Sequence, residues 1–129
     1  TMGYALPAAL GAKLARPDLP VVCFTGDGGM GMVCSALETA VREQLPIVVV
    51  VLADEAMSLI RLKQLATGNK PIGTLIGPTD WVKVAQGYGV HGVTATNYEN
   101  FKSAFATALK ASQPVLIDAR IDPMEYQSF

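Results

Sequence analysis

The segment Ile47–Ala53 is apolar at every position and consists mostly of β-branched residues. A strand without polar positions is covered on both faces, which is typical of a central strand in a parallel sheet. The segment is far shorter than the ~20 residues that are needed to span a bilayer, so we expect no membrane insertion. A chain organised around this strand therefore needs helices on both sides of its sheet.

The rest of the sequence alternates between the two kinds of segment that such a sheet requires. Short apolar runs predict further strands, at residues 21–25, 92–95 and 115–119. Apolar residues at helical spacing predict helices at 3–15, 29–44 and 57–65, one that Thr79 or Asp80 caps, and one that begins with the capping box Thr96-x-x-Glu99. The glycines and prolines of residues 67–79 predict a surface loop. We therefore predict one domain, residues 1–129, with an α/β fold: three α/β/α layers around a mostly parallel sheet.

Composition excludes several classes of protein. Half of the 129 residues are hydrophobic and 16% are charged, which is too apolar for a disordered chain. A net charge of −1 argues against binding to nucleic acid. Cys23 and Cys34 lie within apolar patterns, so we expect them to be buried and reduced, and we expect a cytoplasmic protein without a leader peptide. Because Thr1 stands within an apparent helix, we expect the chain to be an excerpt or a subunit of a larger enzyme.

The predicted strand 21–25 runs directly into Gly26-Asp27-Gly28-Gly29-Met30-Gly31 and then into a helix. One interpretation is a dinucleotide-binding domain, because the glycines match G-x-G-x-x-G and Asp54 ends the next strand, where a ribose ligand would stand. Asp27 argues against it. A carboxylate ~4 Å from a bare phosphate is repelled by about 4 kcal/mol per unit charge at an effective dielectric near 20.

A divalent cation between Asp27 and a diphosphate turns this repulsion into coordination. Asp27 and Asp54 leave the ends of consecutive strands, separated by one helical crossover, so both carboxylates can reach one point at the same sheet edge. Gly28 and Gly29 would present amides to an anion at the start of a helix. Hard oxygen ligands of this kind suit Mg²⁺. The pattern therefore favours a ligand with two linked phosphates and a metal ion.

At these residues the chain resembles thiamine diphosphate-dependent enzymes, specifically the C-terminal cofactor domain of the acetolactate synthase, pyruvate oxidase and benzoylformate decarboxylase group. The resemblance covers essentially the whole chain. It rests on Gly-Asp-Gly followed by a metal-binding position, on the opening Thr-Met-Gly-Tyr-Ala-Leu-Pro-Ala-Ala, on Gly89–Val93 and on the closing segment Pro114–Pro123.

The resemblance implies a Mg²⁺ site formed by Asp27, Asp54 and the backbone carbonyl of Ala56. The family usually has Asn-Asn at positions 53 and 54, where this chain has Ala53-Asp54. The extra carboxylate makes the site more negative, about −3 instead of about −2 with the diphosphate and the metal counted. We therefore expect either that the cofactor binds more weakly or that a basic group such as Arg61 or Lys63 balances the extra negative charge. The plainer interpretation of Asp54 is a helix cap.

The resemblance also assigns cofactor contacts to residues beside the metal ligands. Gly26, Gly28, Gly29 and the amide of Met57 fall where the family contacts phosphate, and Met2 matches the apolar residue that supports the bent cofactor. Met2 could instead simply fill the core at a helix start. Leu59 and Ile60 would face the thiazolium ring or the substrate. For Trp81 and His91 we expect no role in catalysis, and Trp81 should lie in the core.

The implied function is binding of thiamine diphosphate through Mg²⁺ in a decarboxylase or carboligase, a lyase or transferase that acts on a 2-oxo acid. We assign no catalytic residue to this chain. In the family, a glutamate from a separate pyrimidine-binding domain or subunit protonates the pyrimidine ring of the cofactor. We also expect a homo-oligomer. A non-catalytic module, or the β-type subunit of a split decarboxylase, is the alternative, and a domain that binds NAD ranks below it.

Overall fold

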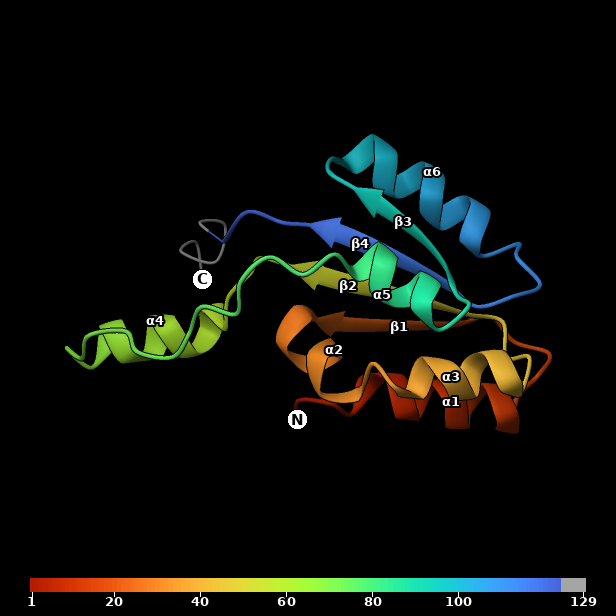
Figure 1. Cartoon of the computed structure of the whole chain (residues 1–129), viewed down its shortest axis with the longest axis horizontal. Coiled ribbons are helices and arrows are strands. Elements are labelled where there is room, and N and C mark those ends of the chain that lie inside the picture. The colour runs from red at the N-terminus through yellow and green to blue at the C-terminus, as the bar shows by residue number, and fades with distance from the viewer. Residues whose placement is uncertain (124–129) are drawn as a thin grey trace.

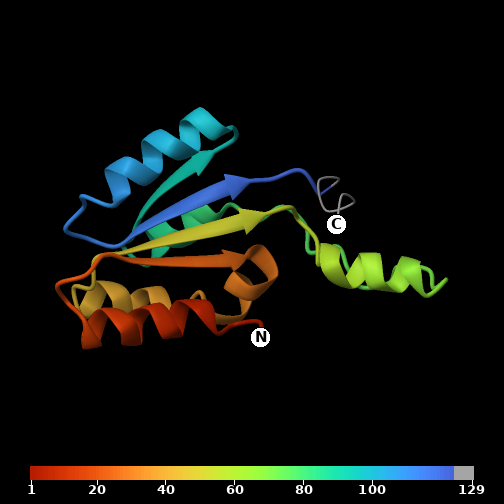
Figure 2. The ribbon, with the colours of Figure 1, turned by 180° about the vertical axis from the view of Figure 1, so that it is seen from behind.

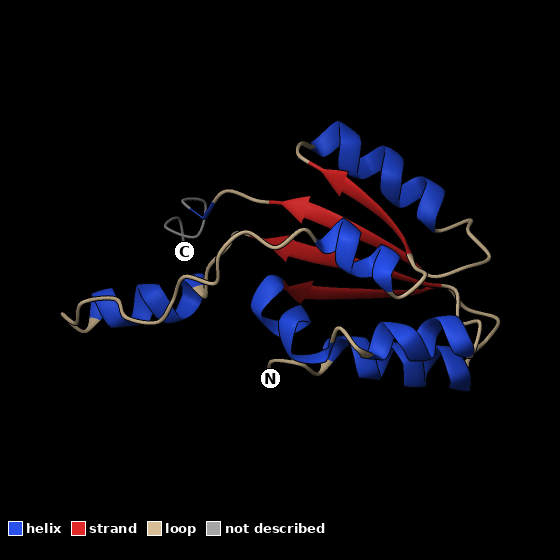
Figure 3. Ribbon diagram, viewed as in Figure 1, coloured by secondary structure: helices blue, strands red, loops and turns tan. Residues whose placement is uncertain are grey.

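The four strands of the computed structural model form one parallel sheet in the order β1-β2-β4-β3 (Figures 1 and 3). The structure describes residues 1–123. The strands are β1 (Val21–Gly26), β2 (Ile47–Ala53), β3 (His91–Ala95) and β4 (Val115–Arg120). Residues Val21 and Ile47 pair at the start of β1 and β2, and Val48 pairs with Val115 across β2 and β4. The parallel α/β fold that the sequence predicts is confirmed, with β2 as an inner strand.

Helices cover both faces of the sheet, as an all-apolar strand requires (Figures 1 and 2). One face packs against α1 (Ala5–Ala15), α2 (Asp27–Val33), α3 (Ala36–Arg42) and α5 (Trp81–Gly87), and the other packs against α6 (Tyr98–Ala108). Alternate residues of β2 face opposite ways: Val49 and Val51 belong to the first core, Val48 and Val50 to the second. This alternation explains why every position of β2 is apolar.

Two helical predictions need correction. The single helix expected at residues 29–44 is divided into α2 and α3, because the amides of Leu37 and Glu38 bond back to the carbonyls of Cys34 and Ser35, three residues earlier. This tighter turn interrupts the α-helical pattern. The capping box Thr96-x-x-Glu99 is also wrong, since the cap of α6 is Asn97, whose side chain accepts a hydrogen bond from the amide of Asn100.

Helix α4 (Ser58–Ala66) and the chain that returns from it extend away from the sheet as an arm (Figures 1 and 2). We call residues 54–79 the arm. Its two legs are joined at the base by backbone hydrogen bonds from the amide of Ile76 to Glu55 and from the amide of Met57 to Thr74. Within the described residues, no helix is long and apolar enough to cross a membrane.

Gly92 marks the closest approach between β3 and α5. A Cβ at this position would lie 3.0 Å from Cα and 3.2 Å from the carbonyl oxygen of Val82, which are backbone atoms that cannot rotate away. We predict that Gly92→Ala lowers the free energy of unfolding by about 1–3 kcal/mol, because α5 must move. Gly11→Ala is the control, since nothing lies within 4 Å of its new methyl group in α1. It should raise the free energy of unfolding by about 0.5–1 kcal/mol, as urea titration would measure.

Candidate functional site

The carboxyl ends of β1 and β2 place two aspartates at the same edge of the sheet. β1 ends at Gly26 and continues without a loop into α2, whose first residue is Asp27. Gly26 pairs with Leu52, and β2 then ends at Ala53, directly before Asp54. Helix α2 thus begins two residues earlier than expected, and the glycine-rich motif forms its first turn rather than a loop before it. This edge is where parallel α/β proteins place their ligands.

Asp27 is a buried carboxylate that the backbone holds from two sides. Asp27 is only 5% exposed to solvent. The amide of Gly28 donates to Oδ1 and the amide of Glu55 donates to Oδ2, each at 2.8 Å. The second bond ties the start of α2 to the turn that follows β2. It therefore fixes the carboxylate at the point where the two strands end.

Burial raises the pKa of the Asp27 carboxyl above its ordinary value. The amides of Gly28 and Glu55 oppose this effect, and the neighbouring charge of Asp54 adds to the increase in pKa. A carboxylate in this setting is destabilised as an anion and gains from a cation beside it. A divalent metal would supply that cation.

If a divalent metal ion binds at Asp27, this pKa shift predicts that its binding depends on pH. Because such a metal needs the ionised carboxylate, acidification should weaken its binding at a higher pH than it would for an exposed aspartate, by up to about tenfold per pH unit below the raised pKa. The raised pKa also means that the cofactor-free chain loses stability as pH rises through it. Calorimetric titrations at fixed Mg²⁺ and a series of pH values, from 7 down to the ordinary pKa of an aspartate, would check the first effect. An affinity that weakens only at that ordinary pKa would contradict it.

All of the sequence-predicted site residues line one pocket, with a volume of about 360 Å³. Its walls come from the N-terminal residues up to the start of α1, from the end of β1 with the start of α2, and from the segment that runs from the end of β2 into the first turn of α4. The set comprises Met2, Gly26, Asp27, Gly28, Gly29, Asp54, Ala56 and Met57, and Leu59 and Ile60 line the pocket as well. The volume lies within the range of small-molecule sites.

The space above Gly28 is bounded by flexible apolar side chains. A Cβ on Gly28 would meet Ile76 Cδ1 at 3.1 Å, Met2 Cε at 3.2 Å and Met57 Cε at 3.7 Å. Glycine therefore leaves room at the first turn of α2 that any side chain would occupy. Met2 is 45% exposed, so it is not a core residue. The glycines, the nearby carboxylates and this apolar rim fit a diphosphate bound through a metal, with an apolar ring system beside it.

The segment after β2 differs in detail from the sequence-based expectation. Asp54 does not cap α4, whose first turn has no side-chain cap; instead its Oδ1 accepts a hydrogen bond from the amide of Ala56 at 3.1 Å. The amide of Met57, expected to face phosphate, donates to the carbonyl of Thr74 at 2.7 Å. That amide can reach a ligand only if the base of the arm rearranges, so Met57 lines the pocket through its side chain.

Three polar residues at this edge were missed by the sequence analysis. Asp118 of β4 is 1% exposed, and its Oδ2 accepts from Nε and Nη2 of Arg120 at 3.1 and 2.8 Å. Arg120 Nη1 also donates to Glu55 Oε1 at 3.1 Å. Burial raises the pKa of Asp118, while Arg120 opposes the shift. The one sign of this cluster in the sequence was Asp118, a charged residue within the apolar run Val115–Ala119.

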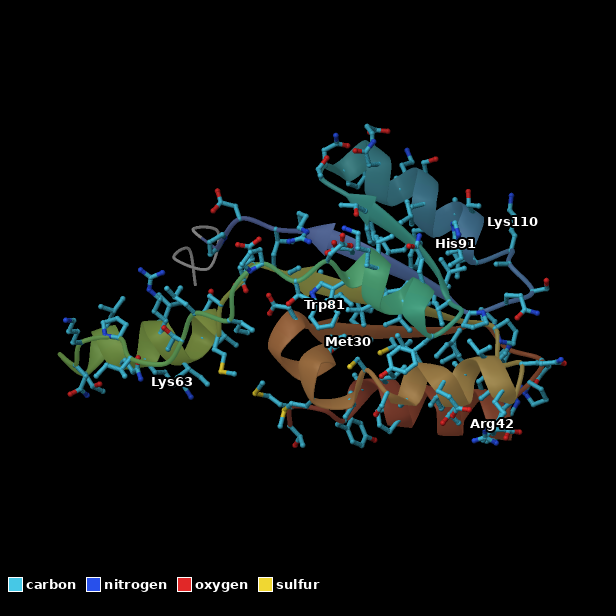
Figure 4. The ribbon with its side chains drawn as sticks, viewed as in Figure 1. Met30, Arg42, Lys63, Trp81, His91 and Lys110 are labelled. Carbon is cyan, nitrogen blue, oxygen red and sulfur yellow. The ribbon has the colours of Figure 1, made fainter. Side chains whose placement is uncertain are left out.

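The residues for which no site role was expected lie elsewhere. Trp81 is 4% exposed and belongs to the core. His91 is exposed and begins β3, at the opposite end of the sheet from the pocket (Figure 4). The two candidates for a compensating basic group, Arg61 and Lys63, are both exposed on the arm. The basic residue that does approach the acidic edge is Arg120.

The two cysteines are both free. Cys23 is buried, which raises the pKa of its thiol to about 11, whereas Cys34 is only half-buried.

A parallel α/β domain whose strand ends present a buried aspartate, glycines and a second carboxylate belongs to the class that binds phosphorylated ligands at the sheet edge. Residues 1–119 match the family model for the thiamine pyrophosphate enzyme, C-terminal TPP binding domain. The chain therefore belongs to this family. This family assignment argues against a dinucleotide-binding domain. It agrees with the resemblance to thiamine diphosphate-dependent enzymes that the sequence indicated.

Individual relatives support the same assignment. The chain is 38% identical over 121 residues to YdaP of Bacillus subtilis (strain 168), covering 94% of this chain and 21% of YdaP. It is 35% identical over 127 residues to the acetolactate synthase isozyme 2 large subunit of Escherichia coli (strain K12), covering 97% and 23%. The structure matches a thiamine diphosphate-dependent 4-hydroxybenzoylformate decarboxylase of Rhodococcus jostii with a TM-score of 0.87 and 37% identity, covering 94% and 23%. The chain thus spans less than a quarter of the length of these relatives.

Proposed function

We propose that this chain binds the diphosphate of thiamine diphosphate through Mg²⁺, as part of a 2-oxo acid decarboxylase or carboligase that resembles acetolactate synthase. The single observation that carries the proposal is the buried carboxylate of Asp27. It is held by the amides of Gly28 and Glu55 and lies beside Asp54, in a pocket with glycine at its first helical turn. A cation would stabilise the ionised form of this buried carboxylate, which burial and the nearby charge of Asp54 destabilise.

Each pocket residue has a distinct task in this proposal. Asp27 and Asp54 supply carboxylate oxygens to Mg²⁺ and Ala56 supplies its carbonyl oxygen, a set of hard ligands that diphosphate oxygens would complete. Gly26, Gly28 and Gly29 keep the strand-to-helix turn open to the diphosphate, and Met2 supports the apolar part of the cofactor. When bound, the cofactor supplies the electron sink that lets a 2-oxo acid lose CO₂.

The proposed partner is a pyrimidine-binding domain or subunit that supplies the catalytic glutamate. Several apolar side chains of the arm, beside the pocket, are exposed: Leu59 (65%), Ile60 (43%) and Leu75 (77%). Exposed apolar surface next to a site is typical of an interface. We place the domain within a larger, cytoplasmic enzyme that is a homo-oligomer.

Calorimetry tests the cofactor and the metal together. Thiamine diphosphate titrated into the chain with Mg²⁺ should bind, and EDTA should abolish the heat of binding. NAD, titrated with EDTA present, should give none. Binding of thiamine diphosphate that survives EDTA would refute the role of the metal, and binding of NAD without metal would favour a dinucleotide site.

Catalysis is tested separately from binding. Pyruvate mixed with residues 1–129, Mg²⁺ and thiamine diphosphate should release no CO₂, because residues 1–119 match the cofactor-binding domain and the proposed glutamate comes from a separate pyrimidine-binding domain or subunit. Robust turnover by the chain alone would refute this part of the proposal. The alternative, a non-catalytic module or the β-type subunit of a split decarboxylase, is distinguished by the gene: a separate gene for a pyrimidine-binding domain supports the split enzyme, and an in-frame upstream continuation supports a single chain.

A further inference from the structure

Arg120 connects three segments that meet at the carboxyl edge of the sheet. It lies at the end of β4, with its guanidinium on Asp118 of the same strand. Nη1 donates to Glu55 Oε1 at 3.1 Å, on the outgoing leg of the arm, and Nη2 donates to the carbonyl of Thr79 at 2.9 Å, on the returning leg. One side chain therefore links β4 to both legs.

The guanidinium of Arg120 is held in place by the buried carboxylate of Asp118. Asp118 is 1% exposed, and both donors that reach its Oδ2 belong to Arg120. Removing Arg120 would leave this buried carboxylate without its cation, which is strongly unfavourable. The planar guanidinium, fixed on Asp118, presents its remaining donors in set directions. Lysine cannot reproduce this fork.

Glu55, the partner of Arg120 on the arm, is also one of the two residues whose amides hold the Asp27 carboxylate. Its backbone has a φ of +62°, in the left-handed region that costs a residue with a side chain roughly 1–2 kcal/mol. In this conformation its amide donates to Asp27 Oδ2 at 2.8 Å, while its carbonyl accepts from the amide of Ile76 at 3.0 Å. Any contact that stabilises this turn also sets the position of the Asp27 carboxylate.

We propose that Arg120, fixed by Asp118, is a positioning residue for Asp27 that acts through the side chain and the amide of Glu55; its effect on metal binding rests on the proposed function. The ion pair itself is partly exposed, with Arg120 at 30% and Glu55 at 48%. Such pairs add little to global stability. The contact should therefore act locally, on the amide of Glu55 and on the metal-dependent site.

The test compares Arg120→Lys with Arg42→Lys in the full chain. Arg42 is a matched control, because it is an exposed arginine of α3 that pairs with Glu38 and Glu43 away from the pocket. In Arg120→Lys, hydrogen exchange of the Glu55 amide, followed by NMR without ligand, should be at least about tenfold faster. The Mg²⁺ concentration that half-saturates thiamine diphosphate binding should rise about tenfold. Arg42→Lys should change neither quantity.

A second variant keeps the experiment decisive if Arg120→Lys fails to fold. Glu55→Gln leaves Asp118 and Arg120 paired and removes only the charge that Arg120 contacts on the arm, so it should shift both quantities in the same direction by a smaller factor. Unchanged exchange of the Glu55 amide in the folded variants overturns the proposal. If the wild-type chain binds no thiamine diphosphate, the proposed function fails, and the exchange rates still decide whether Arg120 positions the turn.

Discussion

Replacing Asp27 with alanine is expected to abolish Mg²⁺-dependent binding of thiamine diphosphate while the sheet stays folded. The substitution removes the most buried carboxylate of the pocket, the one on which the amides of Gly28 and Glu55 converge. Losing a residue that only orients a metal ligand costs about 10–100-fold in affinity. Losing the ligand itself should cost at least about 100-fold, which isothermal titration would register as loss of binding.

Asp18→Ala is the matched control for this experiment. Asp18 is an exposed carboxylate that pairs with Arg16 near the amino end of β1, so it lies at the other end of the strand from Asp27. Its removal should leave cofactor affinity unchanged. If Asp27→Ala still binds with the Mg²⁺ dependence of the wild type, Asp27 is not a metal ligand and the proposed site is wrong.

Met30→Ala should cause a large loss of stability, because Met30 anchors the short helix that begins at Asp27. Met30 is fully buried, with Leu6, Leu37 and Trp81 in the same core cluster (Figure 4). Removing such a side chain leaves a cavity and typically costs about 2–5 kcal/mol. Chemical denaturation followed by circular dichroism would measure the loss.

Met32→Ala provides the comparison on the same helix. Met32 is 65% exposed, two residues along α2. The identical truncation there should change the free energy of unfolding by no more than about 0.5 kcal/mol. Equal losses at both positions would mean that α2 is not held by the core as described.

Much of the architecture followed from local sequence patterns. The apolar run at residues 47–53 identified an inner parallel strand, because only a strand covered on both faces tolerates apolar residues throughout. Thr79 or Asp80 was expected to cap a helix, and the cap is Asp80, whose side chain accepts a hydrogen bond from the amide of Lys83. The approach of Asp27 and Asp54 followed from topology, since parallel strands joined by a crossover end at the same edge.

The features that sequence analysis missed depend on contacts between distant residues. Arg120 and Glu55 are 65 positions apart, and the bond between them depends on β4 lying next to β2. The left-handed turn at Glu55 has no glycine to signal it. The division between α2 and α3 was hidden because apolar spacing continues through Cys34 while the hydrogen bonds change to a three-residue step. Periodicity records which side a residue faces, and it does not record how the backbone bonds.

The arm carries exposed trypsin cleavage sites at Arg61 and Lys63, outside the packed layers (Figure 1). Proteases cut most readily where few contacts resist local opening. The hydrogen bonds between β1, β2, β4 and β3 do not involve the arm, so a nick there would leave the four strands paired. The fold would survive such a cut, while the cleaved segment could swing free of the pocket it helps to enclose.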